Sequence, residues 1–158
     1  MPHPTATNAT DKPVILIING PNLNMLGIRQ PEVYGHDTLA DVEALCRATG
    51  EAVGVGIDFR QSDSEAEIIR WIQLARQSAA GIVINPAGFT STSIAILDAL
   101  LIFDGPIFEC HISPLFRREE FRHLSYVSKA ATAKIEGFGV DGYAFSIERC
   151  ADLIRPRD

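Results

Sequence analysis

Short apolar runs alternate along the chain with segments whose apolar residues recur at helical spacing. The runs at 14–18 and 81–84 are rich in Ile and Val, and a third apolar run opens at 106–108. Runs of this kind are typical of strands that are buried on both faces of a parallel sheet. Two less apolar stretches, 52–59 and 132–135, predict two further strands.

Four segments between and after these runs have the spacing of amphipathic helices. They cover residues 37–49, 64–77 and 92–103, and the last begins at Asp141. Gly50 is expected to end the first helix, and Ser64 with Glu67 to form a capping box ahead of the second. Asp141 is expected to cap the last helix.

Strands that alternate with helices predict an α/β fold in which helices cover both faces of a parallel sheet. Right-handed crossovers leave few topologies, and the flavodoxin-like, doubly wound order 2-1-3-4-5 is the commonest at this length. We expect residues 1–13 to be a flexible tail and residues 14–158 to form a single catalytic domain. Ligands of such sheets bind beyond the carboxyl ends of the strands, at the switch point between strands 1 and 3.

Hydrogen-bonding side chains follow three of the predicted strands, where this rule places a ligand. Because the carboxyl ends of parallel strands meet at one edge of the sheet, the three loops should converge on one crevice. The residues concerned are Asn22, Arg29 and Tyr34 after the first strand, Asn85 and Ser91 after the third, and Glu109, His111 and Ser113 after the fourth.

Tyr34 and Arg29 are one candidate pair for chemistry. A guanidinium beside a phenol favours the phenolate, which would make Tyr34 usable as a base near neutral pH. In the alternative interpretation, Tyr34 packs on its loop and Arg29 is a solvated cation. The spacing of the two residues leaves both interpretations open.

Glu109 and His111 are a second pair, and they share one face because side chains alternate along a strand. A carboxylate on the far ring nitrogen would fix the tautomer of the imidazole, which suits a proton donor. The alternative is a surface histidine at a strand end. Asn22 and Asn85 are amides fit to hold a water or a carboxylate, although many asparagines at such positions only cap turns.

Charge and hydropathy narrow the classes of partner. The 158 residues include 14 Lys and Arg against 20 Asp and Glu, a net charge of −6. An acidic chain without a basic stripe argues against nucleic acid and anionic membranes as partners, whereas a local arginine cluster could still bind a small anion. The longest apolar segment, 94–103, is too short for a membrane span and is interrupted by Asp98. We expect Asp98 to be buried or to lie at an interface.

The cysteines and histidines show no metal-ligand spacing, and the chain has no glycine-rich nucleotide motif. We therefore expect neither a metal nor a nucleotide cofactor. Cys46, Cys110 and Cys150 are odd in number and far apart, which favours buried thiols in a reducing compartment. The first 13 residues lack the apolar core of a secretory signal, so a cytoplasmic location is expected.

A collinear series of motifs extends from residue 14 to residue 154. They are Ile18–Gly27 (INGPNLNMLG), Arg29, Pro31, Tyr34-Gly35, Gln61–Glu65 (QSDSE), Asn85–Gly88 (NPAG), Asp98–Leu100 (DAL), Glu109–Ser113 (ECHIS), Arg118–Arg122 (REEFR) and Ser125–Ser128 (SYVS). In this combination and order they resemble the type II 3-dehydroquinate dehydratase family.

The resemblance implies a flavodoxin-like, cofactor-free lyase that assembles as a dodecamer of trimers. Such an enzyme removes water from 3-dehydroquinate by anti elimination through an enolate, giving 3-dehydroshikimate. Tyr34 would be the base at C2, Arg29 would favour its phenolate, and Asn22 would hold the water that stabilises the enolate oxygen. His111, oriented by Glu109, would protonate the leaving C1 hydroxyl. The implied substrate contacts are Asn85, Ile112 and Ser113 for the carboxylate, Arg122 for a ring hydroxyl, Arg118 on a closing lid, and Asp98 from a neighbouring subunit.

Four positions depart from the family pattern. Ser91 replaces a histidine that bonds a ring hydroxyl, and Leu97 replaces an arginine that precedes Asp98. Pro114 and Leu124 replace an asparagine and a histidine. The proton-transfer residues are intact, so we expect elimination with a weaker grip on the substrate. Ser91 is expected to reach the ring hydroxyl only through a water, or not at all.

Two other functions stay open at this point. The chain could be a divergent relative that eliminates water from another cyclic β-hydroxyketone. It could also be a non-catalytic flavodoxin-like module that binds a ligand without turning it over. Both shikimate biosynthesis and quinate breakdown are compatible with the sequence.

Overall fold

The computed structural model describes residues 11–155, and it confirms the predicted five-stranded parallel sheet. The strands are β1 (Val14–Asn19), β2 (Gly56–Gln61), β3 (Gly81–Asn85), β4 (Ile107–His111) and β5 (Ala133–Glu136). Their order, β2-β1-β3-β4-β5, is the predicted one, and every neighbouring pair is parallel. Residues 1–10 of the expected tail lie outside the described residues.

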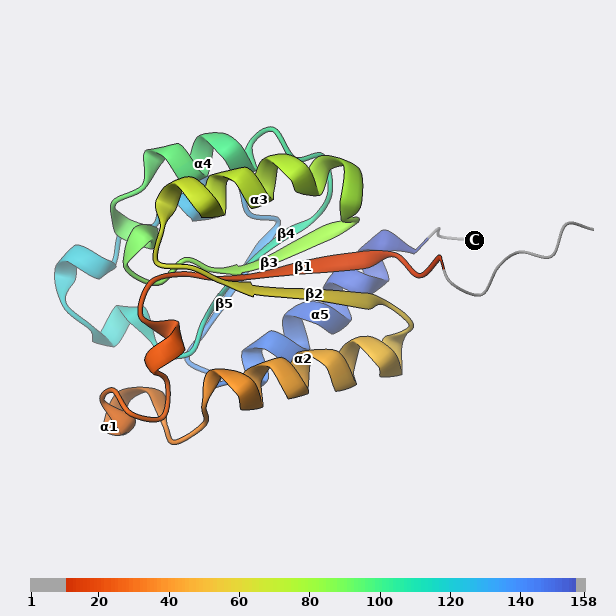
Figure 1. Ribbon diagram of the computed structural model, residues 1–158. Coiled ribbons are helices and arrows are strands. Elements are labelled where there is room, and N and C mark those ends of the chain that lie inside the picture. Colours follow the sequence, from red (N-terminus) through yellow and green to blue (C-terminus); the bar gives the residue numbers. More distant parts are fainter. Residues whose placement is uncertain (1–10, 156–158) are drawn as a thin grey trace, which may run out of the picture.

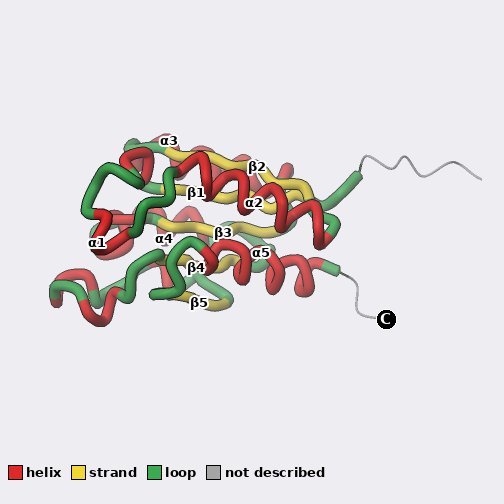
Figure 2. Tube along the Cα trace, turned by 90° about the horizontal axis from the view of Figure 1, so that it is seen from below, coloured by secondary structure: helices red, strands yellow, loops and turns green. Residues whose placement is uncertain are grey.

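Helices cover both faces of the sheet (Figure 1). Helices α2 (Leu39–Val53) and α5 (Asp141–Ile154) lie side by side on one face, as Figure 2 shows from below. Helices α3 (Glu65–Ser78) and α4 (Ile94–Leu100) cover the other face. Each face has its own apolar core, which accounts for the wholly buried pattern of β3 and β4.

Three expectations about helix ends were wrong. Helix α2 passes through Gly50 and ends at Val53, and the cap that follows is Gly54, with a φ of 79° that glycine adopts readily. Gly50 serves packing instead, because a Cβ there would lie 2.6 Å from Cγ1 of Ile57 on β2. Asp141 is the first residue of α5 and makes no capping hydrogen bond. Ser64 does cap α3, but the Glu67 carboxylate accepts from Ser62 and not from the backbone N–H of Ser64.

The segment between β1 and α2, expected as a loop, contains two short helical turns. They are η1 (Leu23–Met25) and α1 (Pro31–Tyr34), and α1 begins at a proline, whose fixed φ suits a first helical position. Gly20 brings this segment against the exit of β3, since a Cβ at Gly20 would lie 2.4 Å from the carbonyl oxygen of Pro86. The first and third strand exits are therefore in direct contact.

The connection from β4 to β5 folds back over the edge of the sheet at which β1 and β3 end, at the left of Figure 1. It consists of three 3-10 turns, η3 (Leu115–Arg117), η4 (Glu120–Arg122) and η5 (Val127–Lys129). Its backbone is joined to the turn after β3 by a hydrogen bond from the Tyr126 N–H to the Thr90 carbonyl.

Within residues 11–155, every helix is too short or too polar to cross a membrane.

Candidate active site

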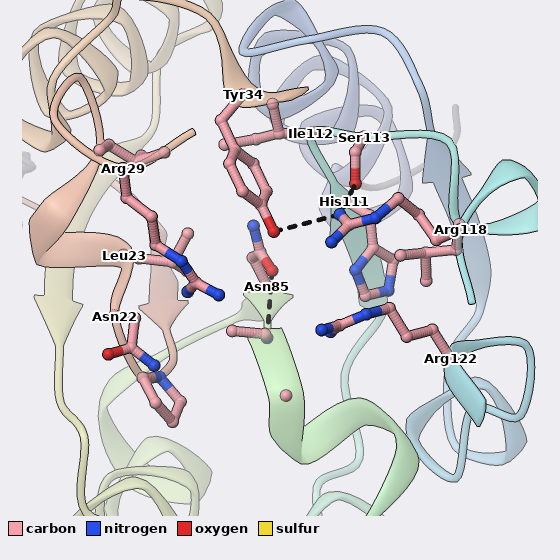
Figure 3. Close-up of a pocket in the computed structure, with 15 residues that line it drawn as sticks. Asn22, Leu23, Arg29, Tyr34, Asn85, His111, Ile112, Ser113, Arg118 and Arg122 are labelled. Carbon is pink, nitrogen blue, oxygen red and sulfur yellow. Dashed lines mark hydrogen bonds between the residues drawn. The ribbon is translucent and has the colours of Figure 1, made fainter. Parts of the chain in front are cut away.

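A pocket lies at the carboxyl edge of the sheet, where the sequence predicted a ligand site (Figure 3). It is built from the segment after β1, the turn after β3, the end of β4 and the β4–β5 connection. Nine of the twelve predicted site residues line it. They are Asn22, Arg29, Tyr34, Asn85, His111, Ile112, Ser113, Arg118 and Arg122.

The charge of the pocket is opposite to that of the chain. The net charge of the chain is −6, but Arg29, Arg118 and Arg122 line the pocket and none of its described lining residues is acidic. Arg118 and Arg122 are partly buried, so their charges are screened less than that of the exposed Arg29, and the three cations together attract an anion. The pocket therefore suits a small anionic ligand.

Tyr34 stands on α1 with its hydroxyl directed toward the β4–β5 connection (Figure 3). Nη1 of Arg118 donates a hydrogen bond of 3.1 Å to Oη of Tyr34. The guanidinium carbon of Arg118 lies 5.5 Å from the centre of the phenol ring, and that of Arg29 lies 6.0 Å from it. Two cations therefore lie beside the phenol, and the one that bonds its oxygen is Arg118, for which the family resemblance implied only a lid role.

Glu109 and His111 lie within β4, so the expectation that they follow the strand was wrong. Their side chains share one face as expected, and Nε2 of His111 is 2.7 Å from Oε1 of Glu109. A carboxylate at Nε2 holds a proton on that nitrogen and leaves Nδ1 for a ligand. His111 lines the pocket, whereas Glu109 is fully buried behind it.

The buried Glu109 carboxylate accepts three side-chain hydrogen bonds. His111 and Ser125 bond Oε1, at 2.7 and 2.6 Å, and Ser128 bonds Oε2. Burial alone would raise the pKa of Glu109, but the bonds from His111, Ser125 and Ser128 favour the charged form and bring its pKa below the usual value. Glu109 is therefore a carboxylate opposite the imidazole.

Asn85, the last residue of β3, is hydrogen-bonded by Tyr143, a residue that the sequence analysis did not single out. The hydroxyl of Tyr143 on α5 donates to Oδ1 of Asn19 at 2.7 Å and accepts from Nδ2 of Asn85 at 3.0 Å. Tyr143 is fully buried, and burial raises the pKa of its phenol well above the usual value. Its place on the apolar stripe of α5 predicted only core packing, because that pattern carries no information on a hydroxyl partner.

Replacement of Tyr143 by phenylalanine should therefore loosen both strand exits. The change removes the bonds of the hydroxyl to Oδ1 of Asn19 and Nδ2 of Asn85, and a buried polar atom left unpaired costs about 1–3 kcal/mol in the free energy of unfolding. Because Asn85 lines the pocket, we also expect a higher KM. Urea denaturation and steady-state kinetics measure the two effects. Tyr126→Phe is a matched control, since the Tyr126 hydroxyl makes no hydrogen bond within residues 11–155; equal stabilities of the two variants would contradict the bridging role.

Asn22 lies at the opposite wall of the pocket in a left-handed conformation, with φ 67°. Asparagine tolerates this conformation better than most residues do. Its backbone N–H donates to Oδ1 of Asp63 at 2.9 Å, and Gln61 Nε2 donates to the same carboxylate oxygen at 3.1 Å. The acidic residue that follows β2 therefore holds the loop that presents Asn22.

Three of the predicted site residues do not line this pocket: Glu109, Ser91 and Asp98. The Ser91 hydroxyl donates to the carbonyl of Leu124 at 2.8 Å, so it ties the β4–β5 connection to the turn after β3. Ser91 lines a second, adjoining pocket, to which Arg122 also contributes. Asp98 is exposed on α4 beside the buried Leu97, so of the two expected locations, burial does not hold in the single chain and a position at an interface stays a prediction.

Among residues 11–155, no three His, Cys, Asp or Glu side chains are grouped so that they could hold a metal ion. The chemical groups that the pocket offers are a phenol with two guanidinium neighbours, an imidazole backed by a carboxylate, and neutral amides. A base, an acid and anion-binding groups in one crevice can remove a proton and a hydroxyl from neighbouring carbon atoms.

Comparisons with known proteins agree with this chemistry. The family model described as dehydroquinase class II matches residues 13–151. The 3-dehydroquinate dehydratase of Streptomyces avermitilis is 60% identical over 140 residues, which is 88% of each chain. The 3-dehydroquinate dehydratase 2 of Pseudomonas putida is 51% identical over 92% of this chain and 98% of its own.

The fold comparison leads to the same family. The crystal structure of a type II dehydroquinase from Propionibacterium acnes superposes with a TM-score of 0.85 and is 42% identical. The match covers 88% of this chain and 96% of that one. On its sequence, its fold and the family model that spans most of its length, this chain belongs to the class II dehydroquinase family.

Proposed function

We propose that this pocket carries out the dehydration with Tyr34 as base and His111 as acid. The chain is a 3-dehydroquinate dehydratase, a hydro-lyase, as its family and its relatives show. The observation that carries the residue assignment is the Arg118–Tyr34 hydrogen bond inside a pocket that His111 also lines. The guanidinium of Arg118 donates to the phenol oxygen, which is the atom that would take the proton from the substrate.

In the first step the Tyr34 phenolate takes a proton from C2 of the substrate. The electron pair of the C–H bond moves toward the neighbouring carbonyl and gives an enolate. A water held by Asn22 donates to the enolate oxygen, and the nearby guanidinium of Arg29 adds positive potential. Donors placed where charge develops lower the barrier more than donors that bind the ground state.

In the second step the enolate collapses and forms the C1–C2 double bond. The C1 hydroxyl leaves with a proton from Nδ1 of His111, so the leaving group is water. The Glu109 carboxylate stabilises the imidazolium before the transfer and keeps a proton on Nε2 after it. Exchange with solvent then returns Tyr34 and His111 to their starting protonation states.

The substrate carboxylate is assigned to the end of β4 and to Asn85. Asn85 uses one amide proton for Tyr143 and keeps the second for a ligand. The Ser113 hydroxyl accepts from Nη1 of Arg118 at 3.1 Å, which leaves its own proton for the carboxylate. The backbone of Ile112 completes this contact, and Arg122 is assigned to a ring hydroxyl.

Arg118→Gln should therefore impair both catalysis and binding. Arg118 contacts the base and the carboxylate-binding Ser113, so we expect kcat to fall and KM to rise. Loss of one hydrogen bond to a charged group is worth about 1.5–3 kcal/mol, or about 10- to 150-fold in kcat/KM. Arg117→Gln is the matched control, because Arg117 is exposed and does not line the pocket. Equal losses in the two variants would assign the effect to overall charge and remove Arg118 from the site.

The direct test of the substrate is an ultraviolet assay for the conjugated enone product after the protein is mixed with 3-dehydroquinate. Turnover by the wild type, lost in the Tyr34 variant, supports the assignment. A folded wild-type protein without turnover would favour the divergent relative that acts on another cyclic β-hydroxyketone.

The assembly is proposed to be a dodecamer of trimers, with Asp98 reaching the pocket of a neighbouring subunit. In support, α4 and the turn that follows it expose Ile94, Leu101 and Ile102 to 54, 61 and 50%, around the exposed Asp98. Exposed apolar side chains grouped on one surface are typical of an interface. Multi-angle light scattering should give a large oligomer, and Ile102→Glu should lower its mass. A fully active monomer would contradict both the assembly and the shared role of Asp98.

The cytoplasm is the proposed location. The three cysteines are buried and free, and burial raises the pKa of each thiol to about 12. Thiols of this kind are neutral packing groups, and unpaired cysteines are common where the compartment is reducing.

A further inference from the structure

The β4–β5 connection reaches the catalytic pair through two serines that stand three residues apart. Ser125 precedes η5 and is buried, and Ser128 lies in η5. The Ser125 hydroxyl donates to Oε1 of Glu109 at 2.6 Å and accepts the backbone N–H of Ser128 at 3.1 Å. The Ser128 hydroxyl donates to Oε2 of Glu109. The short segment from Ser125 to Ser128 therefore holds both oxygens of a single carboxylate.

This contact determines which way the carboxylate faces. Glu109 has 0% exposure, so water does not replace a missing donor. Its Oε1 receives Nε2 of His111 as well as Ser125, while Oε2 is held by Ser128. With both oxygens bound, the carboxylate plane cannot rotate away from the imidazole without breaking a hydrogen bond to a charged group.

The serine turn is also the end of the segment that carries the pocket arginines. Leu124, next to Ser125, accepts from Ser91, and the Tyr126 N–H donates to Thr90. The turn after β3 thus holds the backbone on both sides of Ser125. The placement of the serines is set by these bonds as well as by Glu109.

We propose that Ser125 and Ser128 are positioning residues for the dehydration. They hold the Glu109 carboxylate against Nε2 of His111, so that Nδ1 faces the substrate with its proton. The inference rests on the proposed role of His111 as the acid. It adds two residues that do not line the pocket and whose hydroxyls act through Glu109.

The surroundings of Glu109 contain few other charges. His111 is the titratable group that contacts it from β4, and on β5 Lys134 is in register with Glu109 but paired with Glu136 at 3.1 Å. Lys129, the charged residue of η5, is exposed. The neighbours in β3 and α4 that pack on this face are apolar, such as Ile84. Loss of a serine donor should therefore raise the pKa of Glu109, because fewer bonds then favour its charged form.

The test compares Ser125→Ala and Ser128→Ala with the wild-type enzyme. We expect kcat to fall about tenfold or more in each, as for the loss of one hydrogen bond to a charged group, with KM nearly unchanged. The acidic limb of the kcat–pH profile should move to higher pH, by about one unit for each tenfold effect on the carboxylate. Ser128→Thr, which keeps a hydroxyl on a partly exposed turn, should restore most of the rate.

Ser146→Ala is the matched control. Ser146 is a buried serine whose hydroxyl donates to Gly142 within α5, on the opposite face of the sheet. The Ser146→Ala variant should lose about as much thermal stability as the Ser125 and Ser128 alanine variants, but it should keep the wild-type kcat and pH profile. If the Ser125 and Ser128 alanine variants behave like Ser146→Ala in kcat and in pH profile, the positioning role is overturned.

A second measurement separates this inference from the proposed function. The Nε2 proton of His111 between imidazole and carboxylate should give a low-field proton NMR signal that is absent in His111→Gln. In Ser125→Ala and Ser128→Ala we expect that signal to shift or broaden, whatever the rate of turnover. An unchanged signal would refute the positioning role even in an active enzyme, whereas wild-type protein without turnover but with a serine-dependent signal would refute only the proposed function.

Discussion

Tyr34→Phe is expected to abolish dehydration while the fold and substrate binding remain. The substitution removes one oxygen, whose bonding partner in the pocket is Nη1 of Arg118. General-base catalysis is worth about 10²–10⁴ in rate, so kcat should fall by about that factor with little change in KM. The enone absorbance of the product measures the loss.

A second readout shows whether the lost step is the proton abstraction. Wild-type enzyme in deuterium oxide should exchange the C2 proton of the substrate whenever the enolate returns to the ketone. Tyr34→Phe should abolish this exchange, while Tyr126→Phe, a tyrosine that does not line the pocket, should leave it intact. Exchange at the wild-type rate in the Tyr34→Phe protein would exclude Tyr34 as the base.

His111→Gln is expected to stop the reaction at a later step. Without the proton on Nδ1 of the imidazole, the C1 hydroxyl must leave unprotonated. The loss of a general acid costs about 10²–10⁴ in rate. Glutamine keeps an N–H for Oε1 of Glu109, and the two serines remain, so the buried carboxylate still has donors. The protein should therefore stay folded.

The two variants are distinguished by hydrogen exchange at C2. Because Tyr34 is intact in His111→Gln, the enolate should still form, and we expect deuterium in recovered substrate without product. His36→Gln is the control, as His36 is exposed and does not line the pocket. If His111→Gln retains dehydration at the rate of His36→Gln, the acid is another group.

Much of the fold could be predicted from the sequence because strand and helix patterns are local. The apolar runs within the strands Val14–Asn19 and Gly81–Asn85 are typical of burial on both sheet faces, and five strands alternating with helices leave few topologies. Errors occurred where packing overrides a local signal. Gly50 is a usual helix stop, yet α2 continues because the missing Cβ admits Ile57.

Many of the pocket residues were also predictable, since the carboxyl ends of β1, β3 and β4 meet at one edge. The sequence could not predict which of these side chains contact one another. Arg118 bonds Tyr34 across 84 positions of sequence, and Tyr143 bonds Asn19 across 124. Hydrogen bonds of this kind depend on where a crossover or a loop brings the chain back.

The sequence by itself therefore determined the strand order, the edge that holds the pocket and the types of side chain available there. The tertiary structure decided that Arg118 holds the Tyr34 hydroxyl and that Ser91 ties two loops together. It also decided that the buried Glu109 is held by a turn 16 to 19 residues away. The physical reason is that burial and backbone propensity act over a few neighbouring residues, whereas a hydrogen bond needs two particular atoms within about 3 Å, which only the folded chain provides.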